Sequence, residues 1–331
     1  MGVDLFFVLS GFLVSGLLFR EWKETGKLRI GRFLIRRGFK IYPAFYVMLA
    51  VVFCWKFPGW PYVARDALFV QNYFPSVFPH TWSLAVEEHF YLLLPLLLWG
   101  FRGEAKAPFR GLPILIGALA VTVLVLRFEN LRDVDLLELA ATDPMAMRGL
   151  FTPTHLRCDA LFFGVFLSWM YCFRRSWFEA LGRKSWLLLG AGLALLAPGF
   201  IFELGPHAWL LTVGFTVIYL GAGAILVAFH SQGWSFRPLA FVGFHSYSIY
   251  LWHIPVSYLV LPYLANKRTE PGLFLAYYLV VAIAVGIILT WLIEQPGLRL
   301  REKWFGNAKR GGEGRDAGEK AAAEPSSVAA A

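Results

Sequence analysis

The sequence predicts an all-α transmembrane helix bundle, and three observations predict it. Hydrophobic residues make up 58% of the 331 residues and charged residues only 16%, whereas a typical soluble domain has about 25% charged residues. The mean hydropathy is +0.57. Aromatic residues (17%), 31 Gly and 18 Pro supply the interfacial belts and helix interruptions of a polytopic bundle. This composition excludes a soluble enzyme, a disulfide-rich secreted domain and a disordered chain.

Nine apolar windows are long enough to cross a bilayer core of roughly 30 Å, which takes about 20 residues as helix. They lie near 2–19, 39–57, 83–101, 111–127, 156–173, 186–202, 208–229, 239–262 and 272–293. The window 111–127 is short, and residues 63–74 are a candidate for a partial or re-entrant tenth segment. We therefore expect about nine spans.

Lys and Arg alternate between rich and poor loops along the chain. The first, third, fifth, seventh and ninth loops carry 23 of them, and the other four carry 5. The positive-inside rule then places the C-terminus in the cytoplasm and the N-terminus outside. Because Met1 leads directly into a hydrophobic window, we expect a further helix upstream, which would give ten spans.

The chain divides into two predicted parts. Residues 1–305 form the transmembrane domain, and 306–331 form a disordered cytoplasmic tail because they are rich in Gly, Ala and charge without apolar periodicity. The three cysteines (Cys54, Cys158 and Cys172) lack CxxC spacing. They predict neither a disulfide framework nor a metal site. The net charge of +9 comes from Lys and Arg concentrated in alternate loops, so it does not indicate nucleic-acid binding.

A cationic ridge lies between the first two windows. Arg32, Arg36 and Lys40 follow one another at i, i+4 and i+8, so they share one helical face, with Arg37 beside them. Pro43 follows within a turn and ties the ridge to a bundle helix. Clustered arginines suit a polyphosphate ligand. Binding of anionic lipid headgroups is the alternative.

Ionisable residues inside the windows form a second set. They are costly in a bilayer and mark functional sites. The predicted topology places Asp4, Glu87, Arg157, Asp159 and His253 in the outer half of the membrane. A hydrogen bond to a neighbouring helix is the alternative role for His253, although nearby tyrosines favour a polar-aromatic lining around it.

Two local expectations concern small and polar residues. Ser83 is a candidate N-cap of its helix, and Glu87 and Glu88, about 100° apart on that helix, should point in different directions. Small residues inside a span permit neighbouring helices to approach closely, and this is sufficient to explain Ser10-Gly11 and Gly221.

Six motifs occur in a fixed order and together resemble the acyltransferase-3 family of integral-membrane O-acyltransferases. They are Gly2-Val-Asp4 through Ser10-Gly11, Arg36-Arg37-x-x-Lys40-x-x-Pro43, Trp82-Ser83-Leu-x-Val-Glu87-Glu-x-Phe90-Tyr91, Arg157-x-Asp159, Ser246-Tyr247-Ser-x-Tyr250-Leu-Trp252-His253-x-Pro255 and Glu294-x-Pro296. The resemblance covers residue 2 to about residue 300. It implies a ten-helix fold that moves an acyl group, often acetyl from acetyl-CoA, onto hydroxyls of cell-envelope or exported carbohydrates.

The resemblance, together with the two polar sets described above, assigns roles to three sets of residues and implies acyl-CoA as co-substrate; we expect no bound cofactor and no metal. The catalytic set is Asp4, Glu87 and His253, with Glu87 facing inward. The donor-binding set is Arg32, Arg36, Arg37 and Lys40. The acceptor-side or structural polar set is Trp82, Ser83, Arg157, Asp159, Tyr247 and Tyr250.

The sequence departs from the family at three places. The helix that carries the family's Arg and its catalytic His would lie upstream of Gly2, Lys40 stands where Arg is common, and His89 stands where Gln is common. A nucleophilic role for Ser10 or Ser83 is not favoured, because neither lies in a Gly-x-Ser-x-Gly elbow.

The expected partners are acyl-CoA, a carbohydrate or other hydroxyl acceptor and the lipid bilayer, and the expected location is the inner (plasma) membrane. Two alternatives remain open. One is a transporter or flippase of a lipid-linked sugar, which would also need intramembrane charges and interrupted helices. The other is an inactive, truncated homologue.

Overall fold

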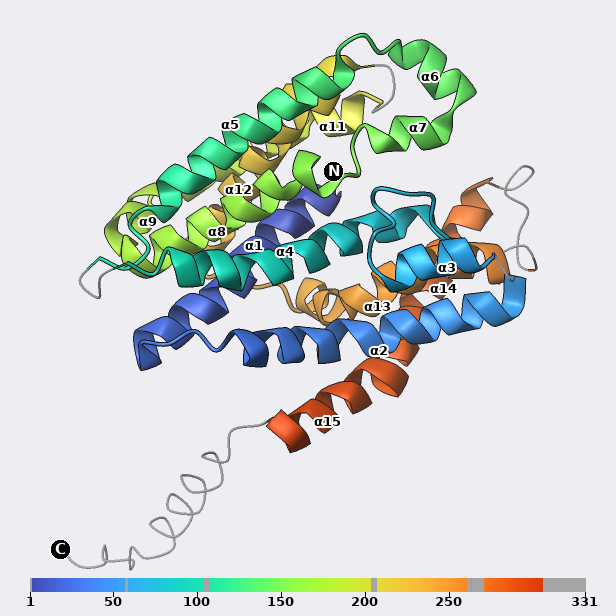
Figure 1. The fold of residues 1–331 in the computed structure, drawn as a ribbon, viewed down its shortest axis with the longest axis horizontal. Coiled ribbons are helices and arrows are strands. Elements are labelled where there is room, and N and C mark those ends of the chain that lie inside the picture. The colour runs from blue at the N-terminus through green and yellow to red at the C-terminus, as the bar shows by residue number, and fades with distance from the viewer. Residues whose placement is uncertain are drawn as a thin grey trace, which may run out of the picture.

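The computed structural model describes residues 2–56, 59–103, 107–203, 207–260, 263 and 271–305 (Figure 1). These residues form helices and connecting turns, and no strand occurs among them, which confirms the all-α class. The predicted tail, residues 306–331, lies outside the described residues.

The main helices run in chain order through the bundle. They are α1 (Gly2–Thr25), α2 (Ile30–Lys56), α4 (Trp82–Gly100), α5 (Leu112–Leu131), α8 (Cys158–Phe173), α10 (Ser185–Leu196), α12 (Phe215–Gln232), α13 (Arg237–Leu259), α14 (Pro271–Leu289) and α15 (Gln295–Phe305). π-helical turns precede α12 (Leu210–Gly214) and α15 (Thr290–Glu294). The shorter helices are α3 (Trp60–Ala67), α6 (Leu136–Thr142), α7 (Pro144–Gly149), α9 (Arg175–Gly182) and α11 (Pro198–Ile201).

Helix covers each of the nine predicted windows, but the count of about nine spans is not confirmed. Five helical stretches in the described part are long and apolar enough to cross a membrane, or six if the pair bent by 80° between α9 and α10 is one span. Two of the remaining windows fall on α4, which carries Glu87 and Glu88, and on α8, which has 16 residues. The multi-pass membrane character follows from the spans that do qualify.

Close contact between α1 and α8 forms the centre of the bundle. A Cβ atom on Gly11 would lie 2.0 Å from the Leu161 carbonyl oxygen, and one on Gly164 would lie 2.2 Å from the Val8 carbonyl oxygen. Gly221 similarly approaches the backbone of α10 at Gly192. The predicted packing role of Gly11 and Gly221 is confirmed, because only a residue without a side chain permits these distances.

The two ends of the bundle differ in what they carry. The end of α1, the start of α2 and α9 lie toward the left in Figure 1, with the end of α15 pointing the same way, whereas α3, α6 and α7 lie at the right. The first end therefore holds the first and fifth loops, which are two of the basic loops. Which side of a membrane this end faces stays a prediction.

Candidate active site

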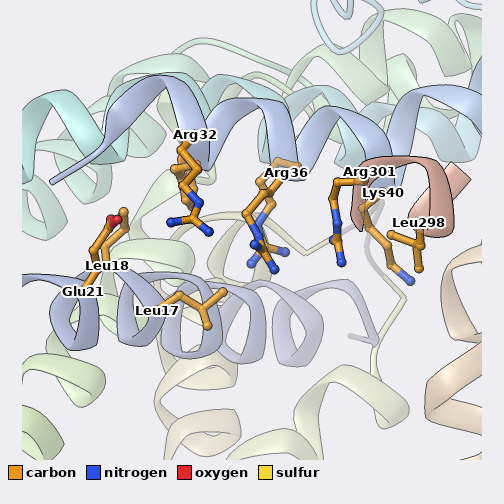
Figure 2. A pocket seen from close by; sticks show the side chains of 10 residues that line it. Leu17, Leu18, Glu21, Arg32, Arg36, Lys40, Leu298 and Arg301 are labelled. Atoms are coloured by element: carbon orange, nitrogen blue, oxygen red, sulfur yellow. The ribbon is translucent and has the colours of Figure 1, made fainter. Parts of the chain in front are cut away.

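A basic pocket of about 350 Å³ lies between α1, α2 and α15. It is lined by Leu17, Leu18, Glu21, Arg32, Phe33, Arg36, Arg37, Lys40, Leu298 and Arg301. Figure 2 shows Arg32 and Arg36 pointing from α2 toward α1, with Arg301 beside them. The structure thus brings the four predicted donor-binding residues to one cavity. It adds Arg301, which sequence reasoning missed because it counted as one of many C-terminal loop cations.

Lys40 differs from the arginines in its contacts. Its ammonium group forms an ion pair with Glu294, whose side chain is only 1% exposed. The other carboxylate oxygen of Glu294 accepts a hydrogen bond of 3.1 Å from Ser248 on α13. Much of the charge of Lys40 therefore compensates a buried carboxylate. A single ammonium is sufficient for that pairing, which accounts for Lys at a position where the family commonly has Arg.

Glu87 lies in the interior between α4 and α1. Its side chain accepts hydrogen bonds from the Ser10 hydroxyl on α1 and from the Tyr91 hydroxyl one turn further along α4. Ser10 therefore binds the carboxylate in addition to permitting helix approach. Two donors on one oxygen can hold a carboxylate in a fixed orientation where water does not reach it.

Glu88 points in a different direction from Glu87 but is also buried, at 6% exposure. The Tyr42 hydroxyl on α2 donates a hydrogen bond of 3.0 Å to it. Both carboxylates are enclosed because α1 covers one side of α4 and α2 covers another, an arrangement that helical periodicity alone does not reveal.

A second cavity, of about 200 Å³, lies beside Glu87 between α1, α4 and α13. Its lining residues are Gly2, Val3, Phe6, Ser83, Leu84, Glu87, Ser246, Tyr247 and Tyr250. The Ser83 hydroxyl lies 2.5 Å from the Tyr250 hydroxyl. The prediction that Ser83 caps α4 is wrong, because the helix begins at Trp82 and Ser83 faces α13 instead.

His253 forms a pair with His80, a residue of the turn before α4. The ring centroids are 4.8 Å apart, in an edge-to-face arrangement. His253 donates through Nδ1 to the Tyr250 carbonyl oxygen at 2.5 Å, and His80 through Nε2 to that of Leu251 at 3.2 Å. Burial lowers the pKa of His80 to about 3. His80 was missed as a site residue because it precedes the apolar window.

Two ion pairs lie buried where α1, α5 and α8 meet. Arg157 donates to Asp4 at 2.5 Å, and Arg127 donates to Asp159 at 2.6 Å. The Arg157 guanidinium carbon also lies 3.7 Å from the centre of the Phe215 ring and 5.5 Å from that of Trp82. Arg127 was missed because the side chain of an Arg at the end of an apolar window is expected to extend to the membrane surface.

Asp66, at the end of α3, anchors the loop that leads into α4. Its carboxylate accepts hydrogen bonds from the Val77 amide at 2.9 Å and from the Thr81 hydroxyl at 3.0 Å. Burial raises its pKa to about 6, against the opposing effect of these two donors. The loop thus fixes the start of the helix that carries Ser83 and Glu87.

The predicted catalytic residues lie in three different sets of contacts. Glu87 bonds to Ser10 and Tyr91, Asp4 pairs with Arg157, and His253 packs edge-to-face against His80. Tyr250 links two of these sets, because it lines the Glu87 cavity and accepts the His253 hydrogen bond through its carbonyl. Among the described residues, no group of three or more His, Cys, Asp or Glu side chains is arranged to hold a metal ion.

Comparison with known proteins identifies the family. A family model described as "Acyltransferase domain" matches residues 1–293. The chain is 30% identical over 347 residues to peptidoglycan O-acetyltransferase OatA of Listeria monocytogenes, an alignment that covers 94% of this chain and 53% of the relative. It is 24% identical over 335 residues to O-acetyltransferase OatA of Staphylococcus aureus, covering 92% of this chain and 53% of the relative.

The chain spans about half the length of these curated relatives. No solved structure matches it. The family model covers nearly all of the helical part and includes five of the six motifs; the sixth, Glu294-x-Pro296, begins one residue beyond it. The chain therefore belongs to the acyltransferase family that the motifs resemble, the acyltransferase-3 family of membrane acyltransferases.

Proposed function

We propose that the protein transfers an acetyl group from acetyl-CoA to a hydroxyl of a cell-envelope carbohydrate. The observation that carries this proposal is the position of Glu87 between two cavities of different character. The basic pocket lies on one side, reached through Tyr91 and Arg37, and the cavity lined by Ser83, Tyr250 and Glu87 itself lies on the other.

The basic pocket is the proposed donor site. Arg32, Arg36 and Arg37 offer planar guanidinium groups suited to phosphate oxygens. The leucines and Phe33 of the same pocket provide apolar surface for the uncharged part of the donor. We place this end of the bundle, together with the C-terminus, in the cytoplasm, where acyl-CoA is made, because the basic loops gather there.

Glu87 is the proposed site of proton transfer. The acceptor hydroxyl gives its proton to a base as its oxygen attacks the thioester carbonyl, the carbon–sulfur bond breaks, and the thiol of CoA leaves with a proton. The Ser10 and Tyr91 hydroxyls, which both donate to Glu87, would hold it in position for the first of these steps.

His253 and Asp4 complete the proposed set from the acceptor side. Because Nδ1 of His253 donates to a carbonyl, the neutral ring presents Nε2 as a lone pair, which is the form that can accept a proton. Asp4 acts through Arg157, which it orients against Trp82 and Phe215. The printed name of the Listeria monocytogenes relative supports peptidoglycan as the acceptor class.

Purified protein, reconstituted with acetyl-CoA labelled on the acetyl group and with soluble peptidoglycan fragments, tests the proposal. We expect the label to appear on carbohydrate as an alkali-labile ester, and Arg36→Ala to raise the KM for acetyl-CoA while the protein still inserts and folds. Movement of a lipid-linked sugar across vesicle membranes without acetyl transfer would support the transporter class and overturn the proposal. An unchanged KM for acetyl-CoA in both Arg36→Ala and Arg37→Ala would also overturn it.

A further inference from the structure

The last described helix, α15, forms one wall of the basic pocket. It contributes Leu298 and Arg301, three residues apart and therefore on the same helical face. α15 comprises Gln295–Phe305, whereas the acyltransferase family model ends at residue 293. The pocket is thus completed by a helix that lies outside the residues the family model matches.

Packing against α2 fixes the position of α15. At Gly297, an added Cβ would lie 3.4 Å from the Pro43 ring and 3.5 Å from the Phe39 carbonyl oxygen. At the far end of the helix, the rings of Trp304 and Phe305 lie 6.2 Å and 5.9 Å from the ring of Phe39. Two contact points along one helix hold Arg301, which lies between them, opposite the α2 ridge.

Arg301 and Arg36 share one carboxylate, that of Glu302. The carboxylate oxygen lies 2.5 Å from Nη2 of Arg301 and 3.7 Å from Nη2 of Arg36. The Glu302 side chain is 54% exposed and that of Arg301 only 19%. Nε of Arg301 is buried and has no hydrogen-bond partner among the described residues. The Glu302 carboxylate therefore bridges the two arginines, and Nε of Arg301 remains a donor without a partner among the described residues.

The excess of positive charge in the pocket lining favours a ligand with several negative charges. Among the described residues, four arginines and one lysine line it, and Glu21 is the one carboxylate. Lys40 is compensated by Glu294, and Glu302 contacts Arg36 and Arg301 from the rim. Like charges held this close repel one another until an anion fills the space between them.

We infer that Arg301 binds the phosphates of the acyl-CoA donor, and that Glu302 occupies the same place until the donor displaces it. The inference rests on the proposed function, since it assumes that this pocket holds the donor. Two guanidinium groups from different helices, Arg36 and Arg301, would clamp the phosphates from both sides. Because Glu302 is exposed, its side chain can turn into solvent when phosphate oxygens replace it at Arg36 and Arg301.

Phosphate groups could also be supplied by an anionic lipid headgroup, and the experiment separates these sources. Purified protein in phosphatidylcholine nanodiscs is titrated with CoA and with 3′,5′-ADP, first alone and then with phosphatidylglycerol added to the bilayer. The variants are Arg301→Gln and Glu302→Gln. Arg299→Gln is the matched control, because it removes the same charge from an exposed position on the same helix outside the pocket.

We expect Arg301→Gln to weaken CoA and 3′,5′-ADP binding by about tenfold, in line with loss of a charge-assisted hydrogen bond. Glu302→Gln should tighten both by about threefold, and Arg299→Gln should leave both unchanged. Tighter binding by Glu302→Gln would exclude poor folding as the explanation, because a variant that merely folds poorly does not bind more tightly.

Three outcomes would overturn the inference in distinguishable ways. Wild-type affinity in both Arg301→Gln and Glu302→Gln, while Arg36→Ala binds weakly, removes the α15 clamp and leaves the proposed donor site standing. Absence of CoA binding by the unaltered protein removes the donor site itself. Competition by phosphatidylglycerol that disappears in Arg301→Gln, with CoA affinity unchanged, makes Arg301 a lipid-headgroup ligand.

Discussion

The guanidinium carbon of Arg37 lies 5.6 Å from the centre of the Tyr91 ring. Arg37 lines the basic pocket, and the Tyr91 hydroxyl donates to Glu87, which lines the second cavity. One aromatic side chain therefore separates the proposed donor phosphates from the proposed site of proton transfer. Its ring contacts the cation on one side, and its hydroxyl contacts the carboxylate on the other.

Tyr91→Phe should separate these two contacts. The ring and its cation–π contact with Arg37 remain, whereas Glu87 loses one of its two donors. We expect kcat for acetyl transfer to fall by about tenfold or more, with the KM for acetyl-CoA within about twofold of the unaltered value. Tyr42→Phe is the matched control, because it removes a hydroxyl from Glu88 in the same way. Equal losses in the two variants would show that Tyr91 has no special relation to the reaction.

Glu87→Gln and Glu88→Gln test which buried carboxylate serves the reaction. Glutamine retains the size and the acceptor oxygen of each side chain but cannot take up a proton. Because Glu87 lines the second cavity and Glu88 points to Tyr42 on α2, transfer should fall by about 10²-fold or more in Glu87→Gln. Glu88→Gln should retain most of its activity. Turnover measured at saturating acetyl-CoA checks this, and comparable losses in both variants would remove the assignment of Glu87.

Most of the helices could be predicted from the sequence because each is a long apolar run bounded by charge. The windows carry the helices, and the glycines mark the closest helix contacts. The number of spans could not be obtained in this way. α4 fills one of the nine windows but is not among the five stretches long and apolar enough to cross a membrane, and its Glu87 and Glu88 are tolerated because neighbouring helices enclose them.

Site residues that lie on one helix could be predicted from the sequence. Contacts between segments far apart in the sequence could not. The ridge of Arg32, Arg36 and Lys40 follows from i, i+4 spacing. The pairing of Arg127 with Asp159 and the placing of Arg301 in the donor pocket join segments that are far apart in the sequence. No local pattern encodes those contacts, since they depend on how the helices pack.

Gly11→Ala should destabilise the bundle, whereas Gly117→Ala should not. A methyl group at Gly11 would overlap the Leu161 carbonyl, so α1 and α8 would have to separate. Gly117 lies in α5 with no neighbouring atom within 4 Å of an added Cβ. We expect Gly11→Ala to lose about 1–3 kcal/mol and Gly117→Ala to be neutral or slightly stabilised. Thermal unfolding in detergent measures both. Unchanged stability of Gly11→Ala would mean that this contact can relax.

The buried pair of Arg127 and Asp159 should behave as a structural pair. Arg127→Met leaves a carboxylate in the interior without its nearest cation and should cost about 3–5 kcal/mol. Changing both residues, as Arg127→Met with Asp159→Leu, removes the uncompensated charge and should recover much of that loss. Acetyl transfer by the folded double variant then tests the role of Asp159 in the site. Recovery of stability without recovery of transfer would show that the pair serves the reaction.

His80 should make the stability of the protein depend on pH. Burial lowers its pKa to about 3 in the folded protein, from 6.5 in the unfolded chain. Below pH 6.5 the unfolded chain therefore takes up a proton that the folded protein refuses, so this contribution to stability is present above pH 6.5 and is lost as the pH falls. Between pH 8 and pH 5 the loss is about 2 kcal/mol.

His80→Gln isolates this effect, because a glutamine amide can still donate to the Leu251 carbonyl and does not titrate. Asp66 changes stability in the opposite direction. Its pKa is raised to about 6, so its ionisation costs stability as the pH rises through that value. Since Asp66 is present in both proteins, its effect cancels when thermal unfolding of the two is compared from pH 8 to pH 5. His80→Gln should lose less stability on acidification than the unaltered protein, and parallel curves for the two would mean that His80 accepts a proton without unfolding.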